Sequence, residues 1–264
     1  MRGRLTLRAI VLVYLGAVLL LPVAVVLYKT FQPGLGAVWD SITTPAAIHA
    51  FWLTVTVTAI AVPLNAVFGV VTALVLVRSR IRGRRLLEAF IDLPFAVSPV
   101  VVGLALTLLY GRRGWLGDAL QSVGVRIIFS TPGIVLATIF VCLPFVVREV
   151  VPVLREVGDD QEQAASTLGA SGWQTFWRVT LPSIRWGLAY GVVLSTARAV
   201  GEFGAVSVVS GKISGETETL TLLVEKRFTN FNLAGAYAAS ALLAVLALVT
   251  LLAMTLVHRR KDTE

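Results

Sequence analysis

Two ionisable side chains, Arg198 and Glu202, lie four residues apart inside a long apolar stretch of the chain, 187–209. An ionised group at the centre of a membrane-spanning helix costs roughly 2.5 to 3.5 kcal/mol, so each needs a partner or a function. With 3.6 residues per helical turn, the two lie about 40° apart and share one narrow face with Ser195. An arginine with a compensating acid would attract a passing anion without trapping it. The spacing equally allows an internal ion pair that only fixes helix packing.

A serine with proline neighbours marks a second candidate position. Ser98 lies between Pro94 and Pro99 in the apolar stretch 89–110. Proline frees backbone carbonyls and kinks a helix, which membrane proteins tolerate where neighbouring groups satisfy those carbonyls. We therefore predict that Ser98 lines the same pathway as Arg198, although an ordinary proline kink would give the same pattern.

A polar segment, 162–184, separates two apolar stretches. Asp159 and Asp160 are expected to cap a short helix with its body at 162–168, because acidic side chains accept hydrogen bonds from a first helical turn. Gly169 follows directly, and glycine is the usual left-handed residue after a helix. The first half of the segment is therefore predicted to be a helix that ends in a glycine turn.

A second helix is predicted to begin at once. Ser171 and Gln174 have the spacing of a capping box, and Pro182 is expected to end the helix. The aromatic residues between them share one face at positions i, i+3 and i+4, and they are Trp173, Phe176 and Trp177. Such a face either binds a partner protein or rests at the lipid headgroups.

The elements around these residues are those of an integral membrane protein. Of the 264 residues, 56% are hydrophobic and only 14% are charged, with a mean hydropathy of +0.83. Soluble domains carry about 25% charged residues. Six apolar stretches reach the roughly 20 residues that cross a hydrocarbon core, and they are Ala9–Tyr28, Phe51–Val77, Ala89–Tyr110, Pro132–Leu154, Gly187–Val209 and Leu233–Val257. We predict an all-α integral membrane protein with six transmembrane helices.

Basic residues indicate the orientation, because they concentrate in cytoplasmic flanks. With six spans, three clusters lie on one side, and they are Arg2, Arg4 and Arg8, then Arg78, Arg80, Arg82, Arg84 and Arg85, and finally Arg259, Arg260 and Lys261. Both termini and the segment 159–182 are therefore predicted to be cytoplasmic. The basic residues behind the formal charge of +8 cluster at the ends of the predicted spans, which argues against a nucleic-acid partner. The opposite loops are less basic but contain Arg112, Arg113 and Arg126.

No catalytic, metal or cofactor site is predicted in the chain itself. Cys142 is the only cysteine, and neither His49 nor His258 has a partner at metal-ligand spacing. A phosphate-binding loop follows the pattern G-x4-G-K-[ST]. The nearest fragment, 210–212, is followed by Ile213, which cannot ligate Mg²⁺.

The polar segment resembles a loop shared by permease subunits of bacterial ABC importers, of the pattern E-A-A-x3-G-x9-I-x-L-P. The match rests on Ala164-Ala165, Gly169 and Val179-x-Leu181-Pro182. In that family the loop forms a coupling helix that docks on an ATPase subunit. The residues that the resemblance assigns to coupling are Glu162, Gln163, Ala164, Ala165, Gly169, Leu181 and Pro182. Gln163 replaces the usual acid, and Glu162 lies just before it.

Three further stretches make the resemblance narrower. ARAVGEFGAVSVVSG, DLPFAVSPVVVGL and TETLTLLVE resemble the W-type permease subunit of sulfate/thiosulfate importers, which are type I binding-protein-dependent systems. The GEFG core also resembles molybdate and tungstate permeases. An ATPase-independent anion transporter and a membrane scaffold are the remaining alternatives, and the coupling-loop pattern and the intramembrane charges argue against them.

The resemblance implies the organisation of a larger assembly. Residues 1–48 are expected to hold the first span, 49–257 the permease domain with a coupling loop at 155–183, and 258–264 a cytoplasmic tail. The implied partners are a paralogous T-type permease, two ATP-binding subunits, an extracytoplasmic sulfate-binding protein and membrane lipid. ATP and Mg²⁺ are expected on the ATPase partner, and this chain on the cytoplasmic (inner) membrane.

Overall fold

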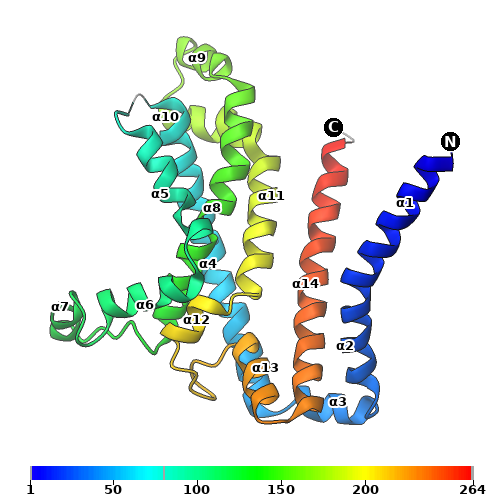
Figure 1. The fold of residues 1–264 in the computed structure, drawn as a ribbon. Helices are drawn as coiled ribbons and strands as arrows, with labels where there is room; N and C mark the ends of the chain where they lie inside the picture. The colour runs from blue at the N-terminus through cyan, green and yellow to red at the C-terminus, as the bar shows by residue number, and fades with distance from the viewer. Residues whose placement is uncertain (1, 80, 263–264) are drawn as a thin grey trace.

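The computed structural model describes residues 2–79 and 81–262, and all its regular elements are helices. Arg80, from the second basic cluster, and residues 263–264 of the predicted tail lie outside the described residues. Figure 1 shows the helices arranged as a bundle on one side, with the N-terminal helices and the C-terminal helix running beside it. The all-α architecture predicted from the sequence is confirmed.

Three long helices form the centre of the bundle: α4 (Pro45–Arg78), α8 (Thr131–Val157) and α11 (Leu181–Val200), each in contact with the other two. Small residues allow α8 to approach both neighbours. A Cβ built on Gly69 of α4 would lie 2.6 Å from Val146 Cγ1, and one on Gly191 of α11 would lie 2.9 Å from Val146 Cα. Glycine therefore sets the spacing of these helices, as is common in membrane bundles.

The N-terminal helices form a rod outside the bundle. Residues of α1 (Arg2–Leu15), the π-helical turn η1 (Gly16–Leu20) and α2 (Leu21–Phe31) follow one another without a break, and they contain the first predicted span. The rod contacts α14 (Leu233–Asp262) and α3 (Leu35–Ile42). Its apolar window is 0% buried within the chain, so nearly all of its hydrophobic surface remains available to lipid or to a partner.

The third predicted span is not one helix. The stretch folds as α5 (Arg84–Ala96) and α6 (Pro99–Tyr110), which are bent by 111° relative to each other. Ser98 precedes Pro99, and a residue before proline is pushed out of the helical region by the proline ring. Its backbone is accordingly extended, with φ −57° and ψ 133°. The stretch 89–110, predicted as one span with a proline kink, is therefore two helices joined by a sharp bend.

The fifth predicted span is also broken. Helix α11 starts at Leu181, six residues before the predicted start at Gly187, and ends at Val200. A short helix, α12 (Gly204–Val209), follows the break. The carboxylate of Glu202 accepts a hydrogen bond from the Ala205 N–H at 2.9 Å, in the first turn of the new helix. Glu202 therefore lies beyond the end of α11. The expected helical face shared by Glu202 and Ser195 is not present.

By length and composition, three helices of the described part can cross a membrane: Ile10–Phe31, Pro45–Arg78 and Thr131–Val157. The bent pair of α5 and α6 would be a fourth, and α14 contributes a shorter apolar stretch, Leu233–Val249. The count of six crossings stays a prediction. In Figure 1, both ends of the chain point toward the end of the molecule that carries α9 (Asp160–Thr167).

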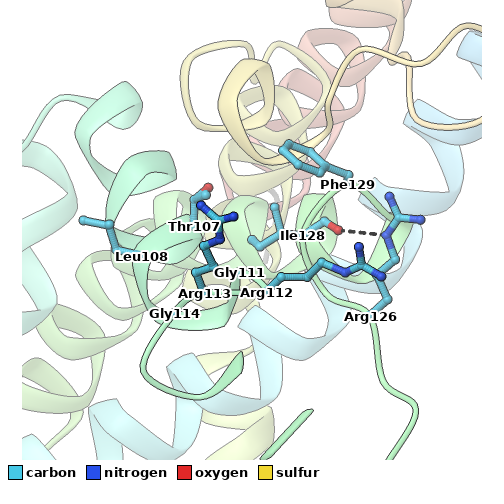
Figure 2. Close-up of a pocket in the computed structure, with 9 residues that line it drawn as sticks. All are labelled: Thr107, Leu108, Gly111, Arg112, Arg113, Gly114, Arg126, Ile128 and Phe129. Carbon is cyan, nitrogen blue, oxygen red and sulfur yellow. Dashed lines mark hydrogen bonds between the residues drawn. The ribbon is translucent and has the colours of Figure 1, made fainter. Parts of the chain in front are cut away.

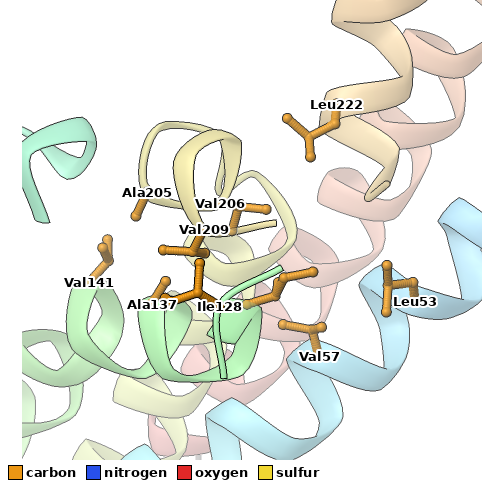
Figure 3. Close-up of a cluster of buried hydrophobic side chains, with 10 residues drawn as sticks. Leu53, Val57, Ile128, Ala137, Val141, Ala205, Val206, Val209 and Leu222 are labelled. Carbon is orange, nitrogen blue, oxygen red and sulfur yellow. The ribbon is translucent and has the colours of Figure 1, made fainter. Parts of the chain in front are cut away.

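At the opposite end, short elements close the bundle around an apolar core. Side chains of α4, α8, α12 and α13 (Leu220–Thr229) converge there (Figure 3), and the buried members include Leu53, Val57, Ile134, Val206, Val209 and Leu222. This packing fixes α12 although it has only six residues. Helix α12 is thus a rigid part of the bundle and not a loop.

Arg227 ties this end together. Its guanidinium donates to the carbonyls of Gly235 at 3.1 Å and Ser41 at 2.9 Å, and to Thr44 Oγ1 at 2.9 Å. Three separate helix ends are joined in this way. Burial lowers the pKa of Arg227 from its ordinary value, because a charged group loses solvation there.

Candidate functional site

The predicted Arg198–Glu202 pair is present at the break after α11. Arg198 Nη1 lies 2.6 Å from Glu202 Oε2. The Glu202 side chain is 1% exposed, whereas that of Arg198 is 32% exposed. Thr221 Oγ1 also donates to the Glu202 carbonyl at 2.8 Å, so α13 helps to hold the acid. Within the described part of the chain the guanidinium has no contact with a polar group beyond this ion pair, and the Arg198 side chain stays partly exposed.

The two helix breaks meet each other. Gly204, at the start of α12, packs on Pro99, at the start of α6, and a Cβ on Gly204 would lie 2.8 Å from Pro99 Cβ. One turn along α6, a Cβ on Gly103 would lie 2.8 Å from the Ala205 carbonyl oxygen. Ser98, predicted to line the pathway, is exposed at this junction. The structure therefore brings Ser98 to the same junction of broken helices as the acid, an arrangement that transporters use at substrate sites.

Ser195 has a different environment from Arg198. It is 0% exposed, and its Oγ has no hydrogen-bond partner among the described residues. Asn65 of α4 is likewise 0% exposed, with neither its amide oxygen nor its nitrogen paired. Neighbours of Asn65 in α4 and of Ser195 in α11 pack into one apolar cluster with a residue of α8. Its members are Val62, Cys142, Val192 and Ala199. Sequence reasoning missed Asn65, although it is the only asparagine in the predicted spans.

The polar segment folds as two helices joined by a glycine turn. Helix α9 ends at Thr167, Gly169 has φ +82°, and α10 (Gly172–Thr175) follows. The predicted capping box is present, because Ser171 Oγ accepts the Gln174 N–H and the Gln174 side chain accepts the Ser171 N–H. Asp159 occupies the cap position of α9, but its side chain makes no capping hydrogen bond.

The second helix of the segment does not end at Pro182. It continues from α10 through a π-helical turn, η2 (Phe176–Thr180), into α11, with the Leu181 N–H donating to the Phe176 carbonyl. The wider π turn precedes the proline in place of the expected stop; π turns occur as single insertions within helices. One continuous helix therefore carries the aromatic face at its start and Arg198 near its end.

The aromatic side chains lie together as predicted. Their ring centroids are 5.5 Å apart for Trp173 and Trp177, 5.5 Å for Phe176 and Trp177, and 6.2 Å for Trp173 and Phe176. Trp173 is 71% exposed and Trp177 is 50% exposed. The cluster thus presents a rigid apolar surface at the end of the molecule that carries α9.

The residues assigned to coupling divide into outward and inward groups. Gln163, Ala164, Gly169 and Pro182 are exposed, while Glu162, Ala165 and Leu181 are partly buried. Leu168, in the turn, is 88% exposed. An exposed apolar tip beside exposed Ala164 suits docking into a groove. Apolar surface in contact with water is unfavourable, and burial against a partner would remove that cost.

Glu162 is held from inside the molecule by a residue that the sequence did not single out. Arg78, the last residue of α4, binds Glu162 through Nε–Oε2 at 2.9 Å and Nη2–Oε1 at 3.3 Å. The same guanidinium donates to the carbonyls of Leu154 and Gly158, which end α8. Thr180 Oγ1 donates to Glu162 Oε1 at 2.8 Å. We call this group of residues the Arg78 clamp, and its members are Arg78, Leu154, Gly158, Glu162 and Thr180.

The Arg78 clamp joins four elements at one point. Helices α4 and α8 supply Arg78 and the accepting carbonyls, α9 supplies Glu162, and η2 supplies Thr180. Arg78 counted only as a topology-setting charge in the sequence, and no local pattern links it to Glu162. Helix α9 is therefore tied by side-chain contacts to the ends of α4 and α8.

No metal centre is found in the described part of the chain, where no three His, Cys, Asp or Glu side chains gather closely enough to hold an ion.

Comparison with known proteins agrees with this architecture. The sequence pattern of the family described as "Binding-protein-dependent transport system inner membrane component" matches residues 65–263. The chain is 51% identical over 256 residues to the sulfate transport system permease protein CysW of Synechococcus elongatus, covering 97% of this chain and 90% of the relative. It is 49% identical over 247 residues to CysW of Escherichia coli K12, covering 94% and 85%.

More distant proteins share the fold. The sulfate transport system permease protein CysT of Synechococcus elongatus is 40% identical over 239 residues, covering 90% of this chain and 86% of that one. A bacterial ABC transporter involved in the import of the acidic polysaccharide alginate superposes with a TM-score of 0.80 at 20% identity, covering 98% of this chain and 96% of that one. With the family pattern matching about three quarters of its length, this chain belongs to the family of inner membrane components of binding-protein-dependent transport systems.

Proposed function

We propose that this chain is a permease subunit of an ATP-driven importer that moves sulfate, and also thiosulfate, across the cytoplasmic membrane. Identities near 50% to proteins named as sulfate transport permeases support the substrate class. The accessible guanidinium of Arg198, placed where two broken helices meet, carries the proposal in the structure. Guanidinium groups bind tetrahedral oxyanions through two parallel N–H bonds, and Glu202 keeps the net charge low enough for release.

The Arg78 clamp supports an ATP-driven mechanism. ATPase subunits that close on nucleotide would move the exposed face of α9 and α10, and the clamp would pass that movement to α4 and α8. The continuous helix from α10 through η2 to α11 would carry the same movement to Arg198. ATP and Mg²⁺ would be bound by those subunits, and this chain would contribute no catalytic group.

Several partners belong to this proposal. The exposed apolar surface of α1 and α2 supports a second permease, for which the T-type paralogue is the natural candidate because a CysT protein is 40% identical to this chain over 239 residues. Two ATPase subunits would bind the two coupling segments of such a pair, and an extracytoplasmic binding protein would deliver sulfate. The orientation with α9 and both termini in the cytoplasm is part of the same proposal.

A transport assay tests the substrate. The assembled complex with its binding protein is placed in liposomes, and uptake of radiolabelled sulfate is measured with and without ATP. We expect ATP-dependent uptake that thiosulfate inhibits strongly and molybdate weakly. Uptake without ATP would indicate an ATPase-independent transporter, and stronger competition by molybdate or tungstate would favour the other oxyanion class that the GEFG core resembles.

A further inference from the structure

Three arginine side chains line a cavity at the end of the bundle opposite α9, and most of the cavity wall is apolar. Arg112 and Arg113 follow α6, and Arg126 precedes α8. Together with residues such as Thr107 and Phe129 they line a cavity of about 510 Å³ (Figure 2). In this view Arg112 extends toward Arg126, and Arg113 extends toward Thr107. Arg112 and Arg126 also line an adjoining cavity of about 320 Å³, so they form the wall between the two.

Within the described part of the chain, no acid forms an ion pair with these three arginines. Asp118 is the only acidic residue between positions 111 and 130, and it forms no ion pair within the described part. None of the carboxylates that form ion pairs in the described part pairs with Arg112, Arg113 or Arg126. Arg126 uses Nε to bind the Ile128 carbonyl at 3.3 Å. Two lysines that follow α12 differ, because Lys212 in the loop pairs with Glu225 and Lys226 of α13 pairs with Glu218.

The wall of the cavity is built into the bundle. Phe129 has φ 60°, a conformation that persists for a bulky residue only where its surroundings enforce it. Its N–H donates to the Val209 carbonyl at 2.8 Å, and a Cβ on Gly211 would lie 2.8 Å from its ring. Val209 ends α12, the helix whose first turn is hydrogen-bonded to Glu202. A short rigid element therefore connects the cavity to the Arg198–Glu202 break.

We propose that this cavity captures a divalent tetrahedral oxyanion at the outer mouth of the pathway, before the anion reaches Arg198. The proposal rests on the proposed function, because the cavity faces the outside only if α9 and both termini lie in the cytoplasm. Uncompensated arginines in a concave site raise the local concentration of anions and offer paired N–H donors to their oxygens. All three side chains are exposed, so the anion is held loosely enough to move on. A free sulfate ion and the phosphate headgroup of an anionic lipid share this chemistry.

Cysteine labelling tests the proposal without depending on transport. Cys142 is 0% exposed, so the unsubstituted chain in a complex with cysteine-free partners serves as the blank. Thr107→Cys places a thiol on the cavity wall, and Ala119→Cys places one on the exposed surface of α7 (Gly117–Ser122) as a matched control. An anionic and a cationic methanethiosulfonate reagent are compared in nanodiscs of phosphatidylcholine, with or without phosphatidylglycerol.

At Thr107→Cys we expect the anionic reagent to react about fivefold faster than the cationic one, relative to the control position, because three nearby charges attract it. Sulfate should slow this reaction more than chloride at equal ionic strength. Replacing Arg112, Arg113 and Arg126 by glutamine should remove both effects. Equal reagent ratios at the two positions, or ratios unchanged by the glutamine replacements, would overturn the site.

The lipid arms identify the source of the anion. Protection by sulfate in phosphatidylcholine that persists with phosphatidylglycerol assigns the cavity to the free ion. Protection by phosphatidylglycerol alone, with no effect of sulfate, assigns it to a headgroup and contradicts capture of the substrate. A complex that shows sulfate protection but no sulfate uptake would contradict only the proposed function, whereas uptake without protection would contradict only this site.

Discussion

Arg78 and Glu162 are 84 positions apart in the chain, yet their side chains meet in two contacts of 2.9 and 3.3 Å at the base of the polar segment. Both side chains are 22% exposed. A hydrogen-bonded pair that is mostly removed from water is stronger than a surface pair and costs more to break. The contact therefore holds α9 in one position relative to α4 and α8.

The first prediction concerns this contact. Arg78→Gln should leave the chain in the membrane and the exposed docking surface unchanged, but should lower sulfate uptake at least about tenfold, because about 1.5 to 3 kcal/mol of charged hydrogen bonding is lost. The informative measurement is uptake per ATP hydrolysed, with ATPase pull-down from the same preparation. Loss of uptake with ATPase binding retained is the expected result.

A matched control for this prediction is Glu88→Gln. Glu88 pairs with Arg84 and Arg155, but all three side chains are at least 39% exposed, so their pairs should contribute little. Exchanging the charges by Arg78→Glu with Glu162→Arg should restore uptake only in part. A carboxylate at position 78 has no N–H to donate to the carbonyls that Arg78 binds. If Arg78→Gln and Glu88→Gln transport equally well, the clamp has no role in coupling.

The second prediction concerns Gly169, whose φ is +82°. Gly169→Asp and Ala164→Asp should insert normally, because neither residue belongs to a predicted span, yet both should reduce ATPase association and stop uptake. No atom lies within 4 Å of a Cβ built on Gly169, so within this chain only backbone strain, roughly 1 kcal/mol, opposes a side chain there.

Two milder variants separate strain from docking at this position. Asparagine tolerates the left-handed conformation better than alanine, whereas alanine is smaller. If strain dominates, Gly169→Asn should bind the ATPase better than Gly169→Ala, and if a partner groove packs on the turn, the order should reverse. Normal ATPase binding by both aspartate variants would instead favour an aromatic segment that rests at the lipid headgroups.

The third prediction concerns Arg198. Arg198→Ala should abolish sulfate uptake, while Arg198→Lys should retain part of it because the charge remains. Breaking a pair that includes a buried acid can cost roughly 3 to 5 kcal/mol, so misassembly has to be separated from loss of substrate binding. Arg198→Ala combined with Glu202→Gln removes the unpaired charge. Recovery of assembly without uptake places Arg198 in the pathway, and recovery of both identifies a purely structural pair.

The fourth prediction concerns Asn65, which is fully buried with its amide unpaired. An unsatisfied buried polar group costs about 1 to 3 kcal/mol, so Asn65→Leu should raise the midpoint of thermal unfolding of the assembled complex. Asn230→Leu, at an exposed position after α13, is the control and should have little effect. A lower midpoint for Asn65→Leu would mean that the amide is paired in the assembly.

The fifth prediction concerns orientation. A cysteine at Gln163, which is exposed on α9, should react with a membrane-impermeant reagent only after the membrane is opened, whereas one at Ala119 should react in intact cells. Buried Cys142 gives little background. Labelling of the Gln163 position from outside would reverse the proposed orientation.

Local sequence patterns were enough to predict the features that depend on near neighbours in the chain. Apolar length placed α4 and α8, and spacing placed the capping box of Ser171 and Gln174 and the left-handed turn at Gly169. These features follow from hydrogen bonds and periodicity within a few residues, so local patterns contain them. The Arg198–Glu202 pair was also found in this way.

Tertiary structure decided where the helices break and which distant groups meet. The break before Pro99 could have been a mild kink, but its 111° bend is accommodated because α12 packs against it through Gly204. The partner of Glu162 is Arg78, and no sequence spacing selects it from the other arginines of that cluster. Contacts of this kind depend on how whole helices pack, since long-range pairing is set by the summed burial of many side chains and not by any local pattern.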